Sequence, residues 1–474
     1  MGGMIKIVGN TGGQKNASPE IRNLRTDGII TPTSFTIKYI AEDFENTILR
    51  HYIYIDGEKK EITKDVGYEN INNEFTYEIN ELSIGTKYKI RIEVTDGIYS
   101  ASSNVLEVST AEPIIYGVKV LENNSNPESC VTYIENATNM TAATKNSLGN
   151  WSNKYPFNKI RLVGFKNGQV VKEINKDNKT QYIDGSPVET DVDVMVEIPK
   201  IYWKFTNISN GYELRISNHK IDSSYNCYAH KVGEVEKDFI YIGAYLASTQ
   251  NGKLRSRSNI KPTTTQTLQV FRQQAQANGP GYQQMNWFTL LLLQILYLIA
   301  YKNLDSQNAL GMGYTNSSSM TTTGGTDKKG FCYGSIDDKI QMCFLGIEDL
   351  YGNLRQFCDG IIINNSYQVL LVPDNKNFND NADNYKNINN FISISISGKI
   401  SKVAHTNEAG FLPKQTTGSV STYYCDSGAF NVDCIGFFGG RWYEKTSAGI
   451  FGINMRLSKT TSASDIGSRL CYLG

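Results

Sequence analysis

The sequence lacks a surplus of charge of either sign. Its 474 residues include 47 basic and 47 acidic side chains, and the formal net charge is zero. A protein dedicated to nucleic acid or to an anionic membrane surface usually shows a basic surplus. The balance therefore argues against nucleic acid as a partner.

A long apolar run is also missing. The most apolar stretch, residues 287–301, is 15 residues long and contains Thr289 and Gln294. A membrane span needs about 20 such residues, so this stretch predicts a buried core helix and no membrane insertion. The opening residues "MGGMIKIVGNTGGQKN" lack the apolar core of a secretory signal, which favours assembly in a cytoplasm.

Metal-binding patterns are sparse. No CxxC or HExxH occurs among the eight cysteines and four histidines, so we expect no zinc, no cofactor and mostly small buried thiols. The Asn/Asp-rich segment 374–390 lacks the mid-loop glycine and closing glutamate of an EF-hand. We expect a solvated loop there, with bound calcium as the alternative.

What is present divides into an arm and two regions. A glycine-rich arm covers residues 1–17, and short alternating segments with intervening turns follow to residue 111, which predicts a β-sandwich. In "ELSIGTKYKIRIEV" a leucine and a glycine precede Tyr88, which resembles the tyrosine corner of fibronectin type III modules. The region departs from that family at Phe35, where a core tryptophan is usual.

Residues 112–474 read as irregular α+β, with a core from about 195 to 474. The stretch "GIEDLYGNLRQFCDG", residues 346–360, resembles the signature of the C-type-lectin-like fold found in formylglycine-generating enzymes, and "GGRW", "AGIF" and "GSRL" resemble its closing strands. The resemblance implies a multidomain chain: an all-β fibronectin III-like sandwich followed by an α+β C-type-lectin-like domain. Arg355 and Phe357 stand where that fold often has tryptophans. The residues to which it gives a structural role are Tyr88 in the sandwich and Gly352, Asn353, Gly439, Gly440, Trp442, Phe451, Gly467 and Arg469 in the closing domain, with Trp442 expected to be buried.

A narrower resemblance covers residues 113–474. Stretches such as "VMVEIPKIYWKF" and "NWFTLLLLQILYLIAYKN" are similar to receptor-binding proteins of phage tails and phage-tail-like bacteriocins that attack Firmicutes, and the Asn-, Lys- and Ile-rich usage fits a clostridial host. This implies a virion-tail protein that adsorbs to a surface-layer protein or wall glycan. Its implied partners are that host receptor, baseplate or tail proteins, and two further copies in a homotrimer.

Two alternatives remain. One is a bacterial or prophage-encoded surface adhesin on the same fold. The other is a glycan-cleaving tail enzyme, for which Asp359, Asp426, Asp433 and Glu444 are candidate carboxylates. A GxSxG elbow, a GxxxxGK loop and a close cysteine pair for copper are all absent, so we expect no enzyme.

Two stretches near the closing strands predict the receptor contact. They mix rigid aromatic and adaptable polar side chains, a composition suited to reading a protein or glycan surface. The predicted contact residues are Tyr423, Tyr424, Asp426 and Asn431 in "TYYCDSGAFNVDC", and Arg441, Tyr443, Glu444 and Lys445 in "RWYEKTS". Packing of Tyr423 or Tyr424 against the sheet is the competing interpretation.

Overall fold

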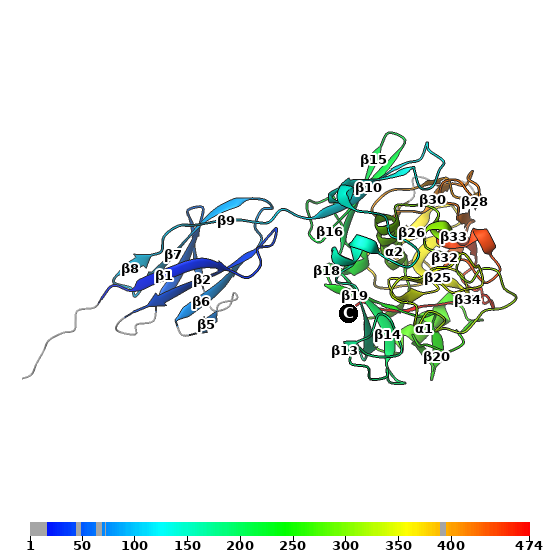
Figure 1. The fold of residues 1–474 in the computed structure, drawn as a ribbon, viewed down its shortest axis with the longest axis horizontal. Helices are drawn as coiled ribbons and strands as arrows, with labels where there is room; N and C mark the ends of the chain where they lie inside the picture. The colour runs from blue at the N-terminus through cyan, green and yellow to red at the C-terminus, as the bar shows by residue number, and fades with distance from the viewer. Residues whose placement is uncertain (1–16, 44–48, 63–68, 72, 389–394) are drawn as a thin grey trace, which may run out of the picture. The chain divides into compact units, whose positions relative to one another are not determined.

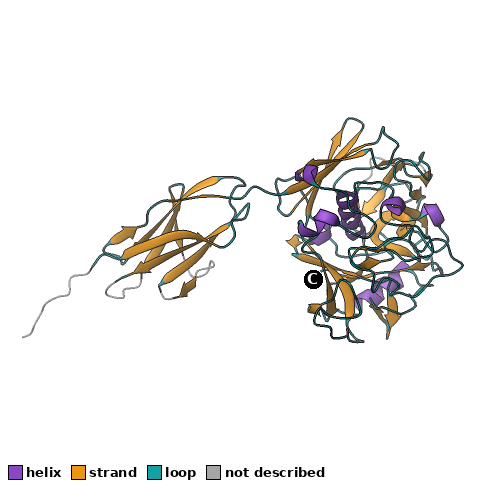
Figure 2. Ribbon diagram, viewed as in Figure 1, coloured by secondary structure: helices purple, strands orange, loops and turns teal. Residues whose placement is uncertain are grey.

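The structure is a computed structural model that describes residues 17–43, 49–62, 69–71, 73–388 and 395–474. It contains two compact units, Met1–Pro113 and Ile114–Gly474, drawn in Figures 1 and 2. The described residues form mainly strands, with few helices. The expected N-terminal arm lies outside the described residues except for Ala17.

The N-terminal unit is a sandwich of two sheets around one apolar core. In β2, buried residues alternate with partly exposed ones, because successive side chains of a strand point to opposite faces. The first sheet has the order β1 (Glu20–Asp27), β2 (Phe35–Glu42), β6 (Glu74–Ile79), β5 (Glu69–Ile71). The second has β4 (Glu58–Ile62), β3 (Arg50–Ile55), β7 (Lys87–Thr95) and β8 (Ser100–Ser102), with β9 (Leu106–Ser109) also on β7.

Tyr88 closes one end of this sandwich. Its hydroxyl accepts a hydrogen bond from the backbone N–H of Ser83 at 2.7 Å, five residues upstream. This is the contact that defines a tyrosine corner. Phe35 is buried in the core, and its ring centroid lies 6.5 Å from that of Tyr88.

The C-terminal unit is built on three larger sheets among its described residues. The β10 sheet has the order β11 (Val131–Glu135), β10 (Ile115–Leu121), β16 (Gly211–Ser217), β15 (Tyr202–Ile208). The β19 sheet has β13 (Gln169–Glu173), β12 (Arg161–Lys166), β14 (Asp193–Pro199), β19 (Phe239–Gly243), β35 (Leu470–Tyr472), β22 (Tyr282–Gln284). The β25 sheet has β27 (Lys386–Asn387), β26 (Val369–Leu371), β25 (Arg355–Ile363), β32 (Cys434–Gly439), β33 (Gly449–Leu457), β31 (Ser427–Phe430), β28 (Ile396–Lys399), with β34 (Ile466–Gly467) parallel to β25.

Smaller elements connect these sheets. The two-stranded ribbons are β17 (Lys231–Val232) with β18 (Val235–Glu236), β20 (Ser248–Gln250) with β21 (Lys253–Arg255), β23 (Cys343–Phe344) with β24 (Ile347–Glu348), and β29 (Lys402–Val403) with β30 (Pro413–Gln415). The helices are α1 (Leu268–Gln276), α2 (Trp287–Tyr301) and α3 (Ser306–Ala309), and the 3₁₀ turns are η1 (Asn136–Asn139), η2 (Gly149–Asn153), η3 (Tyr228–His230) and η4 (Lys445–Ser447). Strands β10 to β13 belong to the same sheets as later strands, so the core begins well upstream of the expected start near residue 195.

Helix α2 is the centre of this unit. It begins after Asn286, whose side chain accepts a hydrogen bond from the Thr289 N–H at 3.0 Å, and all its residues are buried. It packs against both β10 and β25 (Figure 1). The Gln294 amide donates to the Ile450 carbonyl at 2.9 Å, which joins α2 to the closing strands. The predicted buried core helix is therefore confirmed, and within the described ranges no helix has the length and apolar character needed to cross a membrane.

Candidate functional site

The motif at residues 346–360 is held by one buried arginine. Arg469 follows β34 and is fully buried, and burial lowers the pKa of its guanidinium to about 10. Its Nε donates to Gln356 Oε1 at 2.8 Å, and its Nη2 donates to the carbonyls of Glu348 at 2.8 Å and Asp349 at 3.0 Å. Its Nη1 donates to the Gly243 carbonyl at 2.9 Å. The planar guanidinium therefore fixes the motif loop against β19 and the closing strands.

Glycines permit the close approach of backbone segments at this junction. Gly439 ends β32 with φ +88°, and a Cβ there would lie 2.8 Å from the carbonyl oxygen of Leu350. Gly352 has φ +80°, and a Cβ there would lie 2.9 Å from the backbone nitrogen of Tyr314. Glycine adopts such backbone angles without a steric cost. Gly440 also has a positive φ, and Gly467 lies in β34 against Leu354.

Asn353 connects the motif to the loop that follows β32. Its backbone carbonyl accepts from the Trp442 N–H at 3.0 Å, and its side-chain oxygen accepts from the Thr321 N–H at 2.9 Å. Its side-chain amide donates to Asp349 Oδ2 at 2.8 Å. Asp349 is fully buried, and burial raises the pKa of its carboxyl to about 7. The buried Glu348 carboxylate accepts from the N–H groups of Gly324 at 2.8 Å and Thr326 at 2.7 Å. The two carboxylates of the motif thus organise loops from inside the core, a role that the sequence analysis missed.

The segment 441–445 forms a surface that the buried motif supports, here called the Tyr443 face. The Tyr443 side chain is 48% exposed, and the Arg441 guanidinium lies 4.0 Å from its ring centroid, a cation–π contact. Arg441 forms an ion pair with Glu444 at 2.9 Å and another with Asp465. Arg355 donates to Glu444 Oε1 at 2.6 Å. The network of charges fixes Arg441 beneath the ring, so Tyr443 is presented with little freedom.

Lys445 and Asn431 are exposed, whereas Arg441 and Glu444 are half-buried. A hollow of about 40 Å³ beside Arg355 and Glu444 is too small for a ligand larger than a water or two. This hollow therefore adds no ligand cavity to the Tyr443 face. Arg355, a departure from the family pattern, supplies the positive charge that Glu444 pairs with, and Phe357 is buried in a satellite core.

Three predicted roles need correction. Tyr424 is fully buried, and its hydroxyl lies 2.9 Å from that of Tyr212. Asp426 is buried too, where it accepts from the Phe451 N–H at 2.9 Å, and burial raises the pKa of its carboxyl. Neither can contact a receptor, because each satisfies a polar group inside the core. Trp442, predicted to be buried, is only half-buried, because it lies in the loop after β32 beside the exposed Tyr443 ring, at 5.5 Å between centroids.

Other predicted residues are placed as follows. Tyr423 is half-buried, and its N–H donates to the Ser125 carbonyl at 2.7 Å. Phe451 is fully buried in β33, where it packs against Tyr424. All eight cysteines are buried with free thiols. In the part of the chain that the structure describes, no three His, Cys, Asp or Glu side chains converge closely enough to hold a metal ion.

Comparisons with known proteins were made at the level of families, sequences and structures. No family model matches the chain, and no curated protein sequence matches it. Among solved structures, it is similar to the I-band fragment I67–I69 of titin, at 11% identity over 48% of this chain and 93% of that chain, with a TM-score of 0.16. It is also similar to a Major Tropism Determinant U1 variant, at 10% identity over 87% of this chain and 85% of that chain, with a TM-score of 0.24. TM-scores this low do not establish a shared fold.

Proposed function

We propose that the chain is a receptor-binding protein at the tip of a phage tail or tail-like particle. It adsorbs to a surface-layer protein or wall glycan of a Gram-positive, clostridial host. The observation that carries this proposal is the Tyr443 face, an exposed aromatic ring in cation–π contact with Arg441, whose guanidinium is fixed by ion pairs. A preorganised aromatic anchor with a polar rim is the arrangement that recurs at the centre of binding interfaces.

The C-terminal unit is, on this proposal, a C-type-lectin-like domain. Its support is the junction at which Arg469 and Gly439 bring the closing strands against residues 346–360. These are the two segments whose sequences resemble that fold. The N-terminal unit is a fibronectin type III-like spacer, supported by the hydrogen bond between Ser83 and the Tyr88 hydroxyl.

Binding without catalysis is part of the proposal. Of the four candidate carboxylates, Asp359 pairs with Arg272 at 2.7 Å, Glu444 pairs with Arg355, and Asp426 is buried. Each of these is occupied by a structural contact, whereas a glycosidase needs two carboxyl groups free to face one bond. Only Asp433 of the four is exposed.

The test is adsorption of the labelled full chain to host cells. Replacing Tyr443 and Lys445 with alanine should weaken binding about tenfold or more, as loss of a hot-spot residue does. Glu444 is left in place, because its removal would cost Arg355 its ion pair with Glu444 and Arg441 one of its two ion pairs. Tyr99→Ala is the matched control, since Tyr99 is also 48% exposed but lies in the N-terminal unit. Unchanged adsorption by the Tyr443/Lys445 variant would contradict this face as the receptor site.

A second measurement tests the location. Gold-labelled antibody against the chain should decorate the distal end of tail particles released by lysis. Labelling of intact bacterial surfaces without any particle would favour the adhesin instead. Release of reducing ends from purified wall glycan would point to the enzyme.

A further inference from the structure

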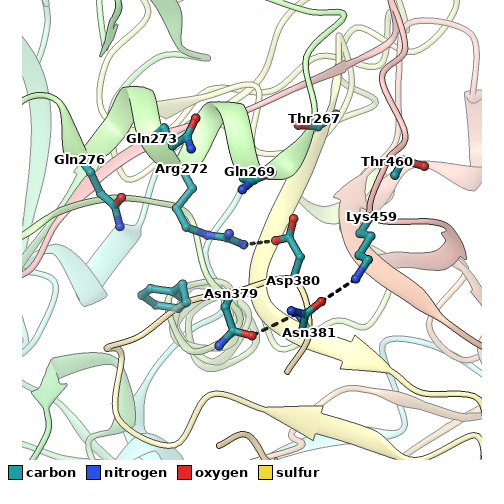
Figure 3. A pocket seen from close by; sticks show the side chains of 11 residues that line it. Thr267, Gln269, Arg272, Gln273, Gln276, Asn379, Asp380, Asn381, Lys459 and Thr460 are labelled. Atoms are coloured by element: carbon teal, nitrogen blue, oxygen red, sulfur yellow. Dashed lines mark hydrogen bonds and ion pairs between the residues drawn. The ribbon is translucent and has the colours of Figure 1, made fainter. Parts of the chain in front are cut away.

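A second recognition element lies outside the Tyr443 face. It is an open hollow of about 510 Å³ bounded by α1, by residues 378–381 and by the start of the loop after β33 (Figure 3). That volume lies within the range of small-molecule sites, about 300–1,000 Å³. Five of its eleven lining residues carry side-chain amides, and we call it the amide pocket.

The helical wall presents a row of unused amides. Helix α1 begins after Thr267, whose hydroxyl accepts from the Val270 N–H, and buries Phe271 and Ala275 in the core. Gln269, Gln273 and Gln276 are four and three positions apart, so they share the opposite face of the helix. All three are exposed, and none of their side-chain amides has a hydrogen-bond partner within the described ranges. They are free to donate and accept toward a ligand.

The facing wall comes from the Asn/Asp-rich segment, which is better organised than the expected solvated loop. Asn379 Oδ1 accepts from the backbone N–H groups of Asn381 at 3.1 Å and Asp383 at 2.9 Å. The Tyr385 hydroxyl accepts from the Asn379 N–H at 3.1 Å. Lys459 Nζ donates to Asn381 Oδ1 at 2.6 Å, which fixes that side chain at the pocket edge (Figure 3). The wall is therefore formed before any ligand arrives.

The floor is an ion-paired arginine. Arg272 is 6% exposed, and its guanidinium donates to both carboxylate oxygens of Asp359, at 2.7 and 2.9 Å. Its Nη2 also donates to Asp380 Oδ1 at 2.7 Å. Two carboxylates thus balance the two cations of the pocket, Arg272 and Lys459. An anion would find no net positive charge here, unlike at a phosphate or carboxylate site.

We propose that the amide pocket binds a neutral saccharide. Side-chain amides both donate and accept hydrogen bonds, which matches the hydroxyl groups of a sugar. Phe378, half-buried beside them, offers an apolar surface for the C–H face of a sugar ring. The pocket gives the chain a glycan specificity separate from the Tyr443 face. The identification of the host envelope as the source of that saccharide rests on the proposed function.

The test uses ligand-observed saturation-transfer NMR on the full chain. The neutral probes are maltotriose, chitotriose and lactose, together with the uncharged fraction of glycans released from Gram-positive walls. The acidic probes are glycerol phosphate and glucuronic acid. Binding of at least one neutral probe is expected, with a loss of at least tenfold in affinity for the Gln273→Ala/Gln276→Ala variant. Alanine favours the helix, so this variant retains the fold.

Asn381→Ala provides a second variant on the other wall and should weaken the same probe. Gln169→Ala, an exposed glutamine in β13, is the matched control and should bind as the parent does. Binding of acidic probes alone, binding unchanged in both pocket variants, or no neutral binding would each overturn the proposal. Failure of this proposal can be distinguished from failure of the proposed function. The Tyr443→Ala/Lys445→Ala variant should lose host adsorption but keep saccharide binding. If the chain binds a neutral probe but the antibody does not label tail particles, the saccharide proposal stands and the proposed tail location is wrong.

Discussion

Arg469 Nε donates to Gln356 Oε1 at 2.8 Å across 113 positions of sequence. Both side chains are fully buried, so this contact and the three carbonyls bound to the same guanidinium lie away from water. A buried polar group that loses its partner costs about 1–3 kcal/mol. The Tyr443 face therefore depends on a residue that it does not expose.

Arg469→Lys should destabilise the C-terminal unit by about 3 kcal/mol, because one ammonium cannot satisfy four separated acceptors. All four tryptophans, residues 151, 203, 287 and 442, lie in that unit, so their fluorescence during denaturant unfolding reports on it alone. Arg456→Lys, at an exposed position of β33, should change the unfolding free energy by less than about 0.5 kcal/mol. Equal effects of the two substitutions would contradict the role of Arg469.

Trp442→Ala should cost only about 1 kcal/mol of unfolding free energy, the ordinary effect of a point substitution. Trp203→Ala should cost about 3–5 kcal/mol, because that side chain is fully buried and leaves a cavity. The Trp203 indole also donates to the Asn407 carbonyl at 3.0 Å. Denaturant unfolding of the two variants compares them directly. Global unfolding caused by Trp442→Ala would restore the original expectation of a buried side chain.

The N-terminal unit should lose stability on acidification through His51. Burial lowers the pKa of this histidine to about 4, and its Nδ1 lies 2.8 Å from the Tyr39 hydroxyl. Above pH 6.5 the imidazole is neutral in both the folded and the unfolded state, so the stability of the unit is at its full value. Between pH 6.5 and 4 His51 binds a proton in the unfolded chain but not in the folded unit. This lowers the free energy of unfolding by about 3 kcal/mol.

Hydrogen exchange of β3 amides, followed from pH 7 to pH 4 and corrected for intrinsic rates, measures this loss. His51→Gln should flatten the pH dependence, since residues 1–113 contain no other histidine. A slope that survives this substitution would assign the effect to carboxylates instead.

On the proposed function we expect a homotrimer, because tail tips repeat around a symmetry axis and weak contacts gain by avidity on a repeating surface. Light scattering at micromolar concentration should give about three times the 53.0 kDa of one chain. A mass near that of one chain would count against the trimer and leave the binding sites as argued.

An apolar run and regular alternation made part of the fold predictable. The uncharged stretch 287–301 predicted α2, and alternation predicted the strands of the N-terminal unit. Which of Tyr423 and Tyr424 is buried could not be predicted in this way, because the loop before β31 has no repeating period. One ring turns partly outward, and the other turns into the core toward Tyr212.

The amide pocket could not be predicted from the sequence, for a different reason. Its floor joins Arg272 to Asp359, 87 positions apart, and no local pattern links the two residues. The segment 374–390 was expected to be solvated because its composition is polar. Many of its residues are exposed, but Asn379 also bonds to the backbone of its own loop, which the composition does not reveal.

The position of β35 sets the order in which the C-terminal unit can form. Ile242 of β19 pairs with Cys471, and Gln283 of β22 pairs with the same residue from the other side. The β19 sheet therefore stays divided until translation has passed Tyr472. A nascent chain from which Tyr472 has not yet emerged therefore exposes the edges of β19 and β22, whose unpaired backbone groups can pair with other chains. Closure is a late and non-local step, of the kind that makes folding slow.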